Sequence, residues 1–243
     1  MTPARGELGR GYVLQTRPWR NTSMLVEALT VDAGRIGLVA RGVRSRGNRT
    51  RPLLEPFQPL LMAWTGRGEL RTLTTVDAER WRPPPAGRRL LAGFYCSELV
   101  MRLLGRDDPN PEVFESYDLA ITALAGDAPA EPALRRFEIE LLDALGFAPP
   151  LDCDAGTGEP VQPDIDYDFL IEHGPAPAYG PAGSEALRVS GAHLLAIAQR
   201  EFDDADVLRS ARRLLRASLA PHLGNRPLKS RELYRSMYGG GST

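Results

Sequence analysis

Six arginines lie within residues 34–51, a stretch of 18 residues that contains no acidic side chain. They are Arg35, Arg41, Arg44, Arg46, Arg49 and Arg51. The first half of the stretch, residues 36–40, is short and apolar, which predicts a buried strand. The second half places Gly, Ser, Asn and Thr between the arginines, which predicts a loop. A strand that carries a basic loop is suited to bind a phosphate backbone, because each neutralised phosphate releases counterions.

Other residues of the N-terminal region extend this hypothesis. Arg67 and Arg71 are further candidates for phosphate contact. Trp19 and Trp64 offer aromatic faces for base stacking, although packing in a core or at its rim explains a tryptophan more simply. The arginine stretch itself has an alternative interpretation, as a solvated run of charge or a disordered loop tip.

The charge of the chain is divided unevenly. The whole sequence has a formal net charge of −1, but residues 1–82 hold 14 arginines against 7 acids. The remaining residues hold 16 basic and 24 acidic side chains. A basic N-terminal part joined to an acidic part indicates that polyanion binding belongs to the N-terminus.

The motifs of common catalytic and metal sites are missing. The single lysine, Lys229, follows Leu228 and not the Gly that a phosphate-binding P-loop requires before its lysine, and the three histidines lack zinc-hydrolase spacing. Asp164, Asp166 and Asp168 alternate as at the start of a calcium loop, but Phe169 stands where that loop requires Gly. A solvated acidic loop explains them better, and a two-metal nuclease is kept as an alternative. We therefore expect no catalytic residues, no cofactor and no metal.

Two cysteines, Cys96 and Cys153, are too few for a disulfide framework or a four-cysteine metal site. Cys96 lies among apolar residues of helical spacing and is expected to be a small buried hydrophobe. No apolar run approaches the length of a membrane span, and the first residues lack the apolar core of a signal peptide. We expect a soluble, cytoplasmic, nucleoid-associated protein.

Short strands separated by turn residues fill the N-terminal part. The pattern predicts strands at residues 12–14, 23–31, 36–40, 60–64 and 70–76. Five strands without a helix favour a small closed barrel of the OB type, a fold that binds oligonucleotides across one face and its loops. An SH3-like barrel fits the same count less well. Three prolines at residues 83–85 can continue neither a ladder nor a helix, so we place the boundary of an OB domain, residues 1–82, before them.

The remainder, residues 83–243, predicts a helical domain. Apolar spacing indicates helices at residues 88–104, after the cap Asn110, from Pro132, from Ser190, after Asp203 or Asp204, and at residues 230–238. Residues 149–187 are rich in Pro, Gly and acids, so they predict an irregular acidic insertion with at most a hairpin near residues 167–171. The last five residues predict a frayed tail. The fold class is therefore α+β and multidomain.

Several stretches together resemble the bacterial RecO recombination family. They are GYVLQTRPWRNTSMLVEALTVDAGRIGLVARGVR, LLEPFQPLLMAWTGRGELRTL, EPALRRFEIELLDALGF and PLKSREL. The resemblance implies an OB domain, a helical bundle and, in some members, a zinc site of four cysteines. Here Cys153 stands alone and Gly156 occupies the next ligand position, so we predict no zinc. The resemblance also implies binding of single- and double-stranded DNA, annealing of complementary strands, and help from RecR in loading RecA onto DNA coated with single-stranded-DNA-binding protein (SSB).

The SSB tail is acidic and ends in Asp-Phe, so its receptor should pair an apolar pocket with an arginine. The resemblance implies a receptor in the helical domain, and the residues we select are Arg135, Arg136, Phe94, Leu99 and Leu141. Ordinary helix surface and bundle core are the alternatives for each of them. In PLKSREL, Lys229, Ser230 and Arg231 either cap the last helix or contact DNA, and capping by Ser230 is the simpler account.

Two other functions are consistent with the residues. One is an RNA-binding OB module of the translation apparatus, and the other is a metal-dependent nuclease that uses the carboxylates of residues 164–168.

Overall fold

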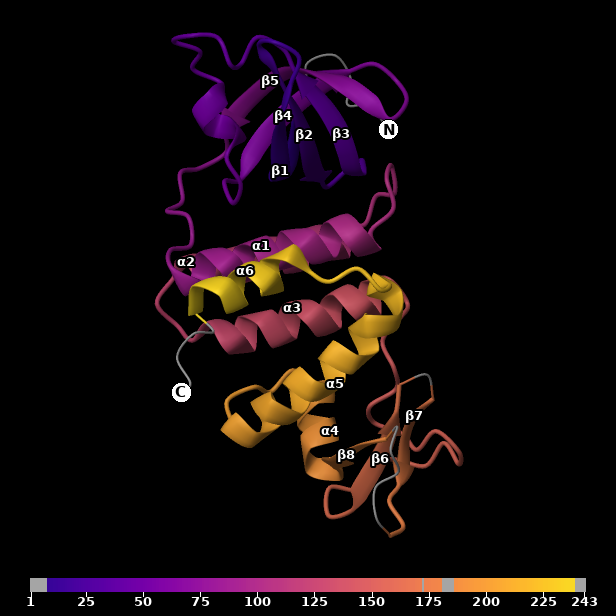
Figure 1. The fold of residues 1–243 in the computed structure, drawn as a ribbon. Coiled ribbons are helices and arrows are strands. Elements are labelled where there is room, and N and C mark those ends of the chain that lie inside the picture. The colour runs from indigo at the N-terminus through magenta and orange to yellow at the C-terminus, as the bar shows by residue number, and fades with distance from the viewer. Residues whose placement is uncertain (1–7, 172, 181–185, 239–243) are drawn as a thin grey trace. The chain divides into compact units, whose positions relative to one another are not determined.

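The computed structural model describes residues 8–171, 173–180 and 186–238 (Figure 1). The chain forms two compact units. The first consists of Met1–Ala130 with Pro227–Thr243, and the second of Glu131–Arg226. The tail predicted to fray, residues 239–243, lies outside the described residues.

The N-terminal strands of the first unit close into a barrel. They are β1 (Gly9–Trp19), β2 (Ser23–Thr30), β3 (Gly34–Ala40), β4 (Leu60–Thr65) and β5 (Leu70–Ala78), and a short 3₁₀ helix, Arg51–Leu54, precedes β4. The order around the barrel is β1-β2-β3-β5-β4, with β3 and β5 parallel and the other pairs antiparallel. This five-stranded closed barrel confirms the OB-type prediction.

The first strand is longer than predicted. The sequence predicted a strand at residues 12–14 only, but β1 continues through Pro18, which lies opposite Met24 at the end of the β1–β2 hairpin. A proline is tolerated at a strand end, where the missing N–H removes no ladder bond. The barrel is filled by apolar side chains that alternate along the strands, among them Val13, Leu38 and Met62.

Three helices complete the first unit: α1 (Arg88–Leu103), α2 (Pro111–Ala125) and α6 (Lys229–Tyr238). As predicted, Asn110 caps α2, because its side chain accepts a hydrogen bond from the backbone N–H of Val113 at 3.0 Å. The turn at Gly34 packs against the α1–α2 connection. A Cβ atom at Gly34 would come within 1.9 Å of the Asp108 carbonyl oxygen, and the backbone there has φ = +64°, so only glycine fits.

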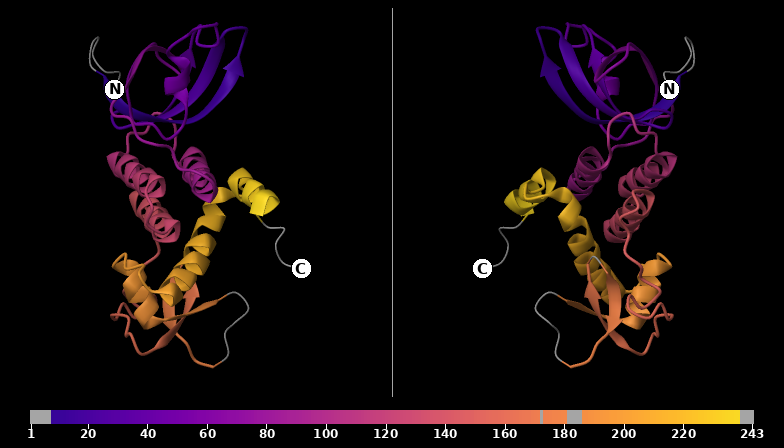
Figure 2. Two further views of the ribbon diagram at one scale, coloured as in Figure 1. Left: turned by 90° about the vertical axis from the view of Figure 1, so that its left-hand side faces the viewer. Right: turned by 90° about the vertical axis from the view of Figure 1, so that its right-hand side faces the viewer.

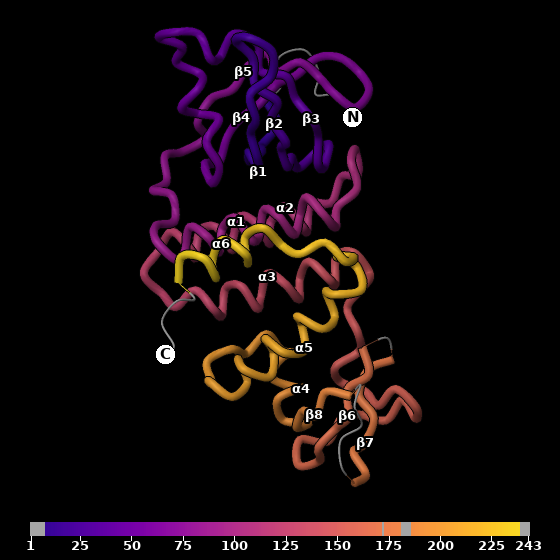
Figure 3. The backbone as a smooth tube through the Cα atoms, in the orientation of Figure 1, coloured from indigo at the N-terminus to yellow at the C-terminus, as the bar shows by residue number. Residues whose placement is uncertain are grey.

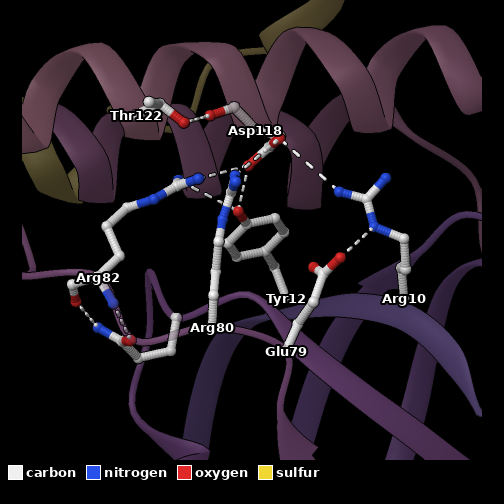
Figure 4. Close-up of polar contacts among 8 residues, drawn as sticks. Arg10, Tyr12, Glu79, Arg80, Arg82, Asp118 and Thr122 are labelled. Atoms are coloured by element: carbon white, nitrogen blue, oxygen red, sulfur yellow. Dashed lines mark hydrogen bonds and ion pairs between the residues drawn. The ribbon is translucent and has the colours of Figure 1, made fainter.

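Asp118 on α2 joins the barrel to the helices (Figure 4). Its carboxylate accepts hydrogen bonds from the Tyr12 hydroxyl and from Arg82 Nη2, the latter at 3.1 Å. Arg10 and Arg80 approach the other carboxylate oxygen at 3.9 Å each. Burial and the contact with Asp118 both raise the pKa of Tyr12, so the hydroxyl stays protonated and keeps donating. Because Tyr12 and Arg82 are buried, they depend on Asp118 for this pairing.

The C-terminal helix α6 lies along α1 (Figure 3). The carboxylate of Glu98 on α1 accepts hydrogen bonds from the backbone N–H groups of Lys229 and Ser230, each at 2.9 Å, and from the Ser230 hydroxyl at 2.7 Å. The helix is therefore capped by Glu98, and the prediction that Ser230 supplies the cap is wrong. Burial alone would raise the pKa of Glu98, but these bonds and the charge of Arg102 outweigh it and lower the pKa.

Acid should release α6 from α1. Because the pKa of Glu98 is lower in the folded protein, its stabilisation is fully present above the ordinary glutamate pKa of about 4.3 and is lost as the pH falls through the folded value. The ¹³C-methyl resonance of Met237 on α6 should move over that pH range. The variant Glu98→Gln should remove this movement, and a Met237 resonance that titrates equally in both proteins would contradict the assignment.

The second unit contains α3 (Ala130–Ala144), β6 (Asp166–Leu170), β7 (Gly174–Pro177), β8 (Leu187–Ser190), α4 (Gly191–Ala198) and α5 (Ala205–Leu223) (Figure 2). The strands form an antiparallel sheet in the order β7-β6-β8. The hairpin predicted near residues 167–171 is present as β6 and β7, and β8, which begins at the last residue of the predicted insertion, adds a third strand to it. The prolines that argued against a strand lie in β7 at the sheet edge, where a missing N–H is tolerated. Pro221 lies inside α5, and Gly224 follows its end.

None of the described helices is long and apolar enough to cross a membrane.

Candidate nucleic-acid interface

The loop after β3 is ordered by its own backbone and side chains. Val43 is buried in the barrel core, and the Arg44 backbone N–H donates to the Thr22 carbonyl at 2.8 Å. The Asn48 side chain accepts hydrogen bonds from the backbone N–H groups of Thr50 at 2.8 Å and Arg51 at 3.1 Å. The alternative of a disordered tip therefore does not describe this loop.

Five of the predicted phosphate-binding residues share this loop and its continuation into the 3₁₀ helix. All five are exposed, and within the described residues none forms an ion pair with a carboxylate. We call them the loop arginines: Arg41, Arg44, Arg46, Arg49 and Arg51. Because no acid of the described chain neutralises them, their charge is available to an anionic ligand.

The β1–β2 hairpin adds residues that sequence reasoning did not include among the phosphate contacts. Arg44 Nη1 donates to the Arg20 carbonyl at 3.2 Å, which places the hairpin tip beside the loop. Arg17 and Arg20 are exposed, and the Arg20 guanidinium lies 6.0 Å from the centre of the Trp19 ring. The Trp19 side chain is 37% exposed and offers a face for stacking. The pairing of Met24 with Ala40 puts this end of the hairpin beside the loop, and this pairing became visible only in the structure.

The second tryptophan considered for stacking has a different role. Trp64 is 2% exposed and belongs to the barrel core, so its ring is not available to a base.

Two other predicted arginines are held inside the first unit. Arg35 Nε donates to the Leu104 carbonyl at 2.9 Å, and its guanidinium lies 3.5 Å from Glu27. Burial lowers the pKa of Arg35, while the charge of Glu27 opposes that change. Arg71 forms an ion pair with Asp107. Both residues tie the barrel to the α1–α2 connection, which gives them a structural role that the sequence did not reveal.

Arg67 lies in the β4–β5 turn and is exposed. Leu70 pairs with Gly37, and β5 runs parallel to β3, so residues before Leu70 extend toward Gly34. The loop arginines follow the opposite end of β3. The structure therefore does not bring Arg67 together with the loop arginines.

A second basic surface lies on α5 in the other unit. Arg209, Arg212, Arg213 and Arg216 have the spacing of one helix face, and all four are exposed. Arg209 pairs with Asp206, and Arg212 pairs with Glu131. Arg213 and Arg216 form no ion pair within the described part of the chain. This face can therefore hold phosphate groups.

The residues selected for binding the SSB tail are divided between the two units. Phe94 and Leu99 lie on α1, whereas Leu141, Arg135 and Arg136 lie on α3. Leu99 and Leu141 are completely buried, so neither presents surface to a ligand. Phe94 is 36% exposed, with its ring centre 5.1 Å from that of Phe57.

The two arginines of α3 differ in environment. Arg135 is buried and pairs with Glu138 at 2.9 Å, whereas Arg136 is exposed and donates to the Arg200 carbonyl at 3.0 Å. Arg200 lines a hollow of about 430 Å³ in the second unit. The rest of the lining is mostly apolar: Ile139, Ala148, Pro149, Pro150, Leu151 and Ala198, with Asp143 and Asp152. Arg200 forms an ion pair with Asp143, whereas Arg136 forms none within the described residues. Apolar residues beside an arginine without a carboxylate partner are the combination expected of a receptor for an acidic aromatic tail.

Zinc does not fit the residues around Cys153. The carboxylate of Asp154 accepts hydrogen bonds from the backbone N–H groups of Gly156 and Thr157, each at 2.7 Å. Residues 152–161 are closed further by backbone bonds, such as that from Val161 N–H to the Asp152 carbonyl at 2.8 Å. The described residues contain no group of three or more His, Cys, Asp or Glu side chains that could hold a metal. The carboxylate of Asp154 therefore organises this turn through hydrogen bonds to the backbone.

Chelation should leave the second unit unchanged, whereas removal of this carboxylate should destabilise it. We expect Asp154→Ala to lower the melting temperature, because two backbone N–H groups lose a charged acceptor. Treatment with EDTA should have no effect on either protein. The exposed neighbour Asp152 provides the matched control Asp152→Ala, which keeps the backbone bond to Val161. A melting temperature that falls on chelation would show that a metal closes the turn.

Asp168, one of the three acidic residues considered for calcium or for a nuclease, is engaged elsewhere. Asp168 forms two hydrogen bonds with the Arg188 guanidinium, at 2.7 and 3.1 Å, across the β6–β8 pair.

Comparison with known proteins covers both parts of the chain. A family model described as recombination protein O N terminal matches residues 7–80, and one described as recombination protein O C terminal matches residues 85–232. The DNA repair protein RecO of Alkalilimnicola ehrlichii is 48% identical over 227 residues, which cover 93% of this chain and 90% of that protein. The RecO of Methylococcus capsulatus is 42% identical, covering 96% of this chain and 95% of that protein. The RecO of Klebsiella pneumoniae is 42% identical, covering 93% and 91% respectively. The chain therefore belongs to the recombination protein O (RecO) family.

Proposed function

We propose that this protein acts in DNA repair and homologous recombination as a DNA-annealing mediator without enzymatic activity. Residues 1–82 form its nucleic-acid-binding domain, and residues 83–243 form a helical domain that recruits other proteins. The observation that carries the proposal is the ordered set of loop arginines at one end of an OB-type barrel, exposed and without carboxylate partners in the described residues. Family membership supports the role in repair. The protein acts in the cytoplasm, associated with the nucleoid.

Binding at this surface needs only charge and stacking. The loop arginines, together with Arg17 and Arg20, neutralise phosphates and release counterions. Trp19 supplies a ring on which a base stacks, and Arg20 supports that ring from the hairpin tip. Because these contacts ignore base identity, the surface takes single- and double-stranded DNA of any sequence.

Annealing also requires that two repelling strands be held at once. The arginine face of α5 provides a second phosphate-binding surface, on a unit distinct from the barrel. Each strand then has cations that offset the repulsion of the other, and base pairing supplies the remaining free energy without any bond being broken. No ATP and no metal ion are needed for this step.

The helical domain recruits SSB. We place the acidic, Phe-ending tail of SSB in the hollow lined by Ile139, Pro149 and Leu151, with Arg136 at its carboxylates. With RecR, the protein then helps load RecA onto SSB-coated DNA.

The tail site predicts different effects for two neighbouring arginines. Arg136→Ala should weaken binding of a fluorescent SSB-tail peptide by about tenfold, because one charge-assisted contact is lost while the fold is kept. Arg135→Ala should instead lower stability, since it leaves Glu138 buried without its cation. Arg209→Ala, at an exposed arginine on α5, is the matched control and should leave peptide affinity unchanged. If wild type and Arg136→Ala bound the peptide with the same affinity in anisotropy titrations, the tail would not bind in this hollow.

The proposed function is tested with complementary oligonucleotides coated with SSB. Annealing should occur without ATP or magnesium and should stop when SSB lacks its C-terminal tail. Strand cleavage in the presence of magnesium would show a nuclease instead. Preference for structured RNA and indifference to DNA would show an RNA-binding module.

A further inference from the structure

The segment that joins β5 to α1 carries an exposed tryptophan among arginines. Trp81 is 78% exposed, more than either of the other two tryptophans of the chain. Residues 80–97 contain no acidic side chain, and their four arginines are Arg80, Arg82, Arg88 and Arg89. An aromatic ring among arginines is the composition of sites that bind single-stranded nucleic acid without regard to sequence. The nucleic-acid interface described above includes none of these residues.

The backbone on both sides of Trp81 is fixed to the segment before β4. The Glu79 backbone N–H donates to the Pro59 carbonyl at 3.0 Å. The Gln58 side chain donates to the Arg82 carbonyl at 2.5 Å and accepts from the Arg82 backbone N–H at 3.3 Å. The three prolines that follow restrict the chain further on its way to α1. The indole is therefore held on a rigid backbone, so little conformational entropy is lost when it contacts a ligand.

The neighbours of Trp81 on either side reach toward α2, whereas its own ring stays in solvent. Arg80 and Arg82 extend to the carboxylate of Asp118, at 3.9 and 3.1 Å (Figure 4). Arg82 is buried there, but the side chain of Arg80 remains 58% exposed. An exposed cation thus directly precedes the exposed ring in the chain.

The arginines of this segment carry more charge than the acids beside them. Asp118 and Glu79 are shared among three arginines. Arg82 lies closest to Asp118, so Arg80 has no acid of its own. Beyond the prolines, Arg88 at the start of α1 is exposed and forms no ion pair within the described part of the chain. Positive charge is therefore available before and after the ring.

The surroundings of the ring favour a base over a protein partner. No other large aliphatic or aromatic side chain of residues 71–93 is exposed, whereas a protein-docking patch gathers several of them. A single aromatic plane with cations on either side in the chain suits a nucleotide, because a nucleotide offers both a flat base and a charged phosphate.

We propose that Trp81 is a base-stacking residue for single-stranded DNA, and that Arg80 and Arg88 hold phosphates of the stacked strand. The proposal rests on the proposed function, because it adds a contact to the same ligand. Stacking requires an unpaired base, since in a duplex the neighbouring bases cover each face. Charge alone does not make that distinction, so Trp81 gives the protein a preference for single strands. Once two strands have paired the contact is lost, which favours release of the annealed duplex.

Fluorescence anisotropy with a labelled oligothymidine and with a duplex of the same length tests the proposal on the full-length protein. Trp81→Ala should weaken single-strand binding by about fivefold or more and change duplex binding by less than about twofold. Trp81→Phe keeps an aromatic ring and should recover most of the loss. The matched control is Leu119→Ala on α2, which removes a leucine that is 61% exposed in the same unit and should change neither affinity.

Tryptophan fluorescence locates the contact. In the variant Trp19→Phe only Trp64 and Trp81 remain, and Trp64 is buried in the barrel core. Oligothymidine should therefore quench the fluorescence of this variant through Trp81, whereas the duplex should not.

Three results with these variants would each overturn the proposal: equal losses of single-strand and duplex affinity in Trp81→Ala, unchanged single-strand affinity, or absence of quenching. If Trp81→Ala kept normal DNA affinity but no longer annealed SSB-coated strands, the ring would contact a protein, which would also overturn it. The proposed function has a separate readout. Alanine at Arg44, Arg46 and Arg49 should reduce binding of both DNA forms whether or not Trp81 stacks on a base.

Discussion

Replacing Arg44, Arg46 and Arg49 together with alanine should weaken DNA binding by about tenfold or more at low salt and make it less dependent on salt. These side chains are exposed and have no carboxylate partner in the described residues, so their loss removes cations that DNA would otherwise use. Each single-strand phosphate contact contributes about 0.7 to the slope of log affinity against log salt, so three lost contacts should reduce the slope by about 2. Fluorescence anisotropy of a labelled oligothymidine over a salt series measures both quantities.

The fold should be unaffected, because the loop is fixed by Val43 and Asn48, which remain. Arg235→Ala serves as the control, since it removes an exposed cation from α6 that is not among the candidate DNA contacts. That variant should keep the wild-type slope. If the triple variant also kept it, the loop arginines would not contact phosphates, whatever the effect on affinity. The separate variant Arg67→Ala, at the β4–β5 turn, tests by the same salt series whether that end of the barrel contacts DNA.

Among substitutions that remove a charge from the first unit, Asp118→Ala should be the most destabilising. It should lower the free energy of unfolding by about 3 kcal/mol. The substitution leaves Arg82, which is 8% exposed, without its carboxylate, and it leaves the buried Tyr12 hydroxyl without its acceptor. Both groups were desolvated on folding, and neither regains water unless the barrel separates from α2. Urea unfolding followed by tryptophan fluorescence reports this change selectively, because all three tryptophans lie in the first unit.

A matched substitution separates this effect from a general loss of negative charge. Asp77 is exposed on β5, so Asp77→Ala should change stability by no more than about 0.5 kcal/mol. Asp118→Asn keeps an acceptor for Tyr12 but removes the charge that Arg82 requires. Its loss of stability should therefore lie between those of Asp77→Ala and Asp118→Ala. If Asp118→Ala behaved like Asp77→Ala, the contact of barrel and α2 would rest on apolar packing alone.

The amino-acid sequence determined the barrel and most helices because their signals are local. Alternating apolar residues and glycine turns specify strands whichever element they later pair with. Asn110 followed by Pro111 fixes the start of α2, and Asp204 caps α5 as expected. The loop arginines were predicted in the same way. A run of arginines without acids and with turn-forming neighbours is expected to lie in an exposed loop, because unpaired charges are costly to bury.

Tertiary structure decided everything that depended on a distant partner. Arg35 and Arg44 look alike in sequence, yet Leu104 and Glu27 hold the first, while the second stays exposed. Arg135 and Arg136 are adjacent, but helical geometry turns one into the interior beside Glu138 and the other toward Arg200, far along the chain. The cap of α6 comes from Glu98, over a hundred residues away, because the carboxylate needs only a short distance in space. Charge can be counted along a chain, but whether it is free is settled by which opposite charges folding brings near.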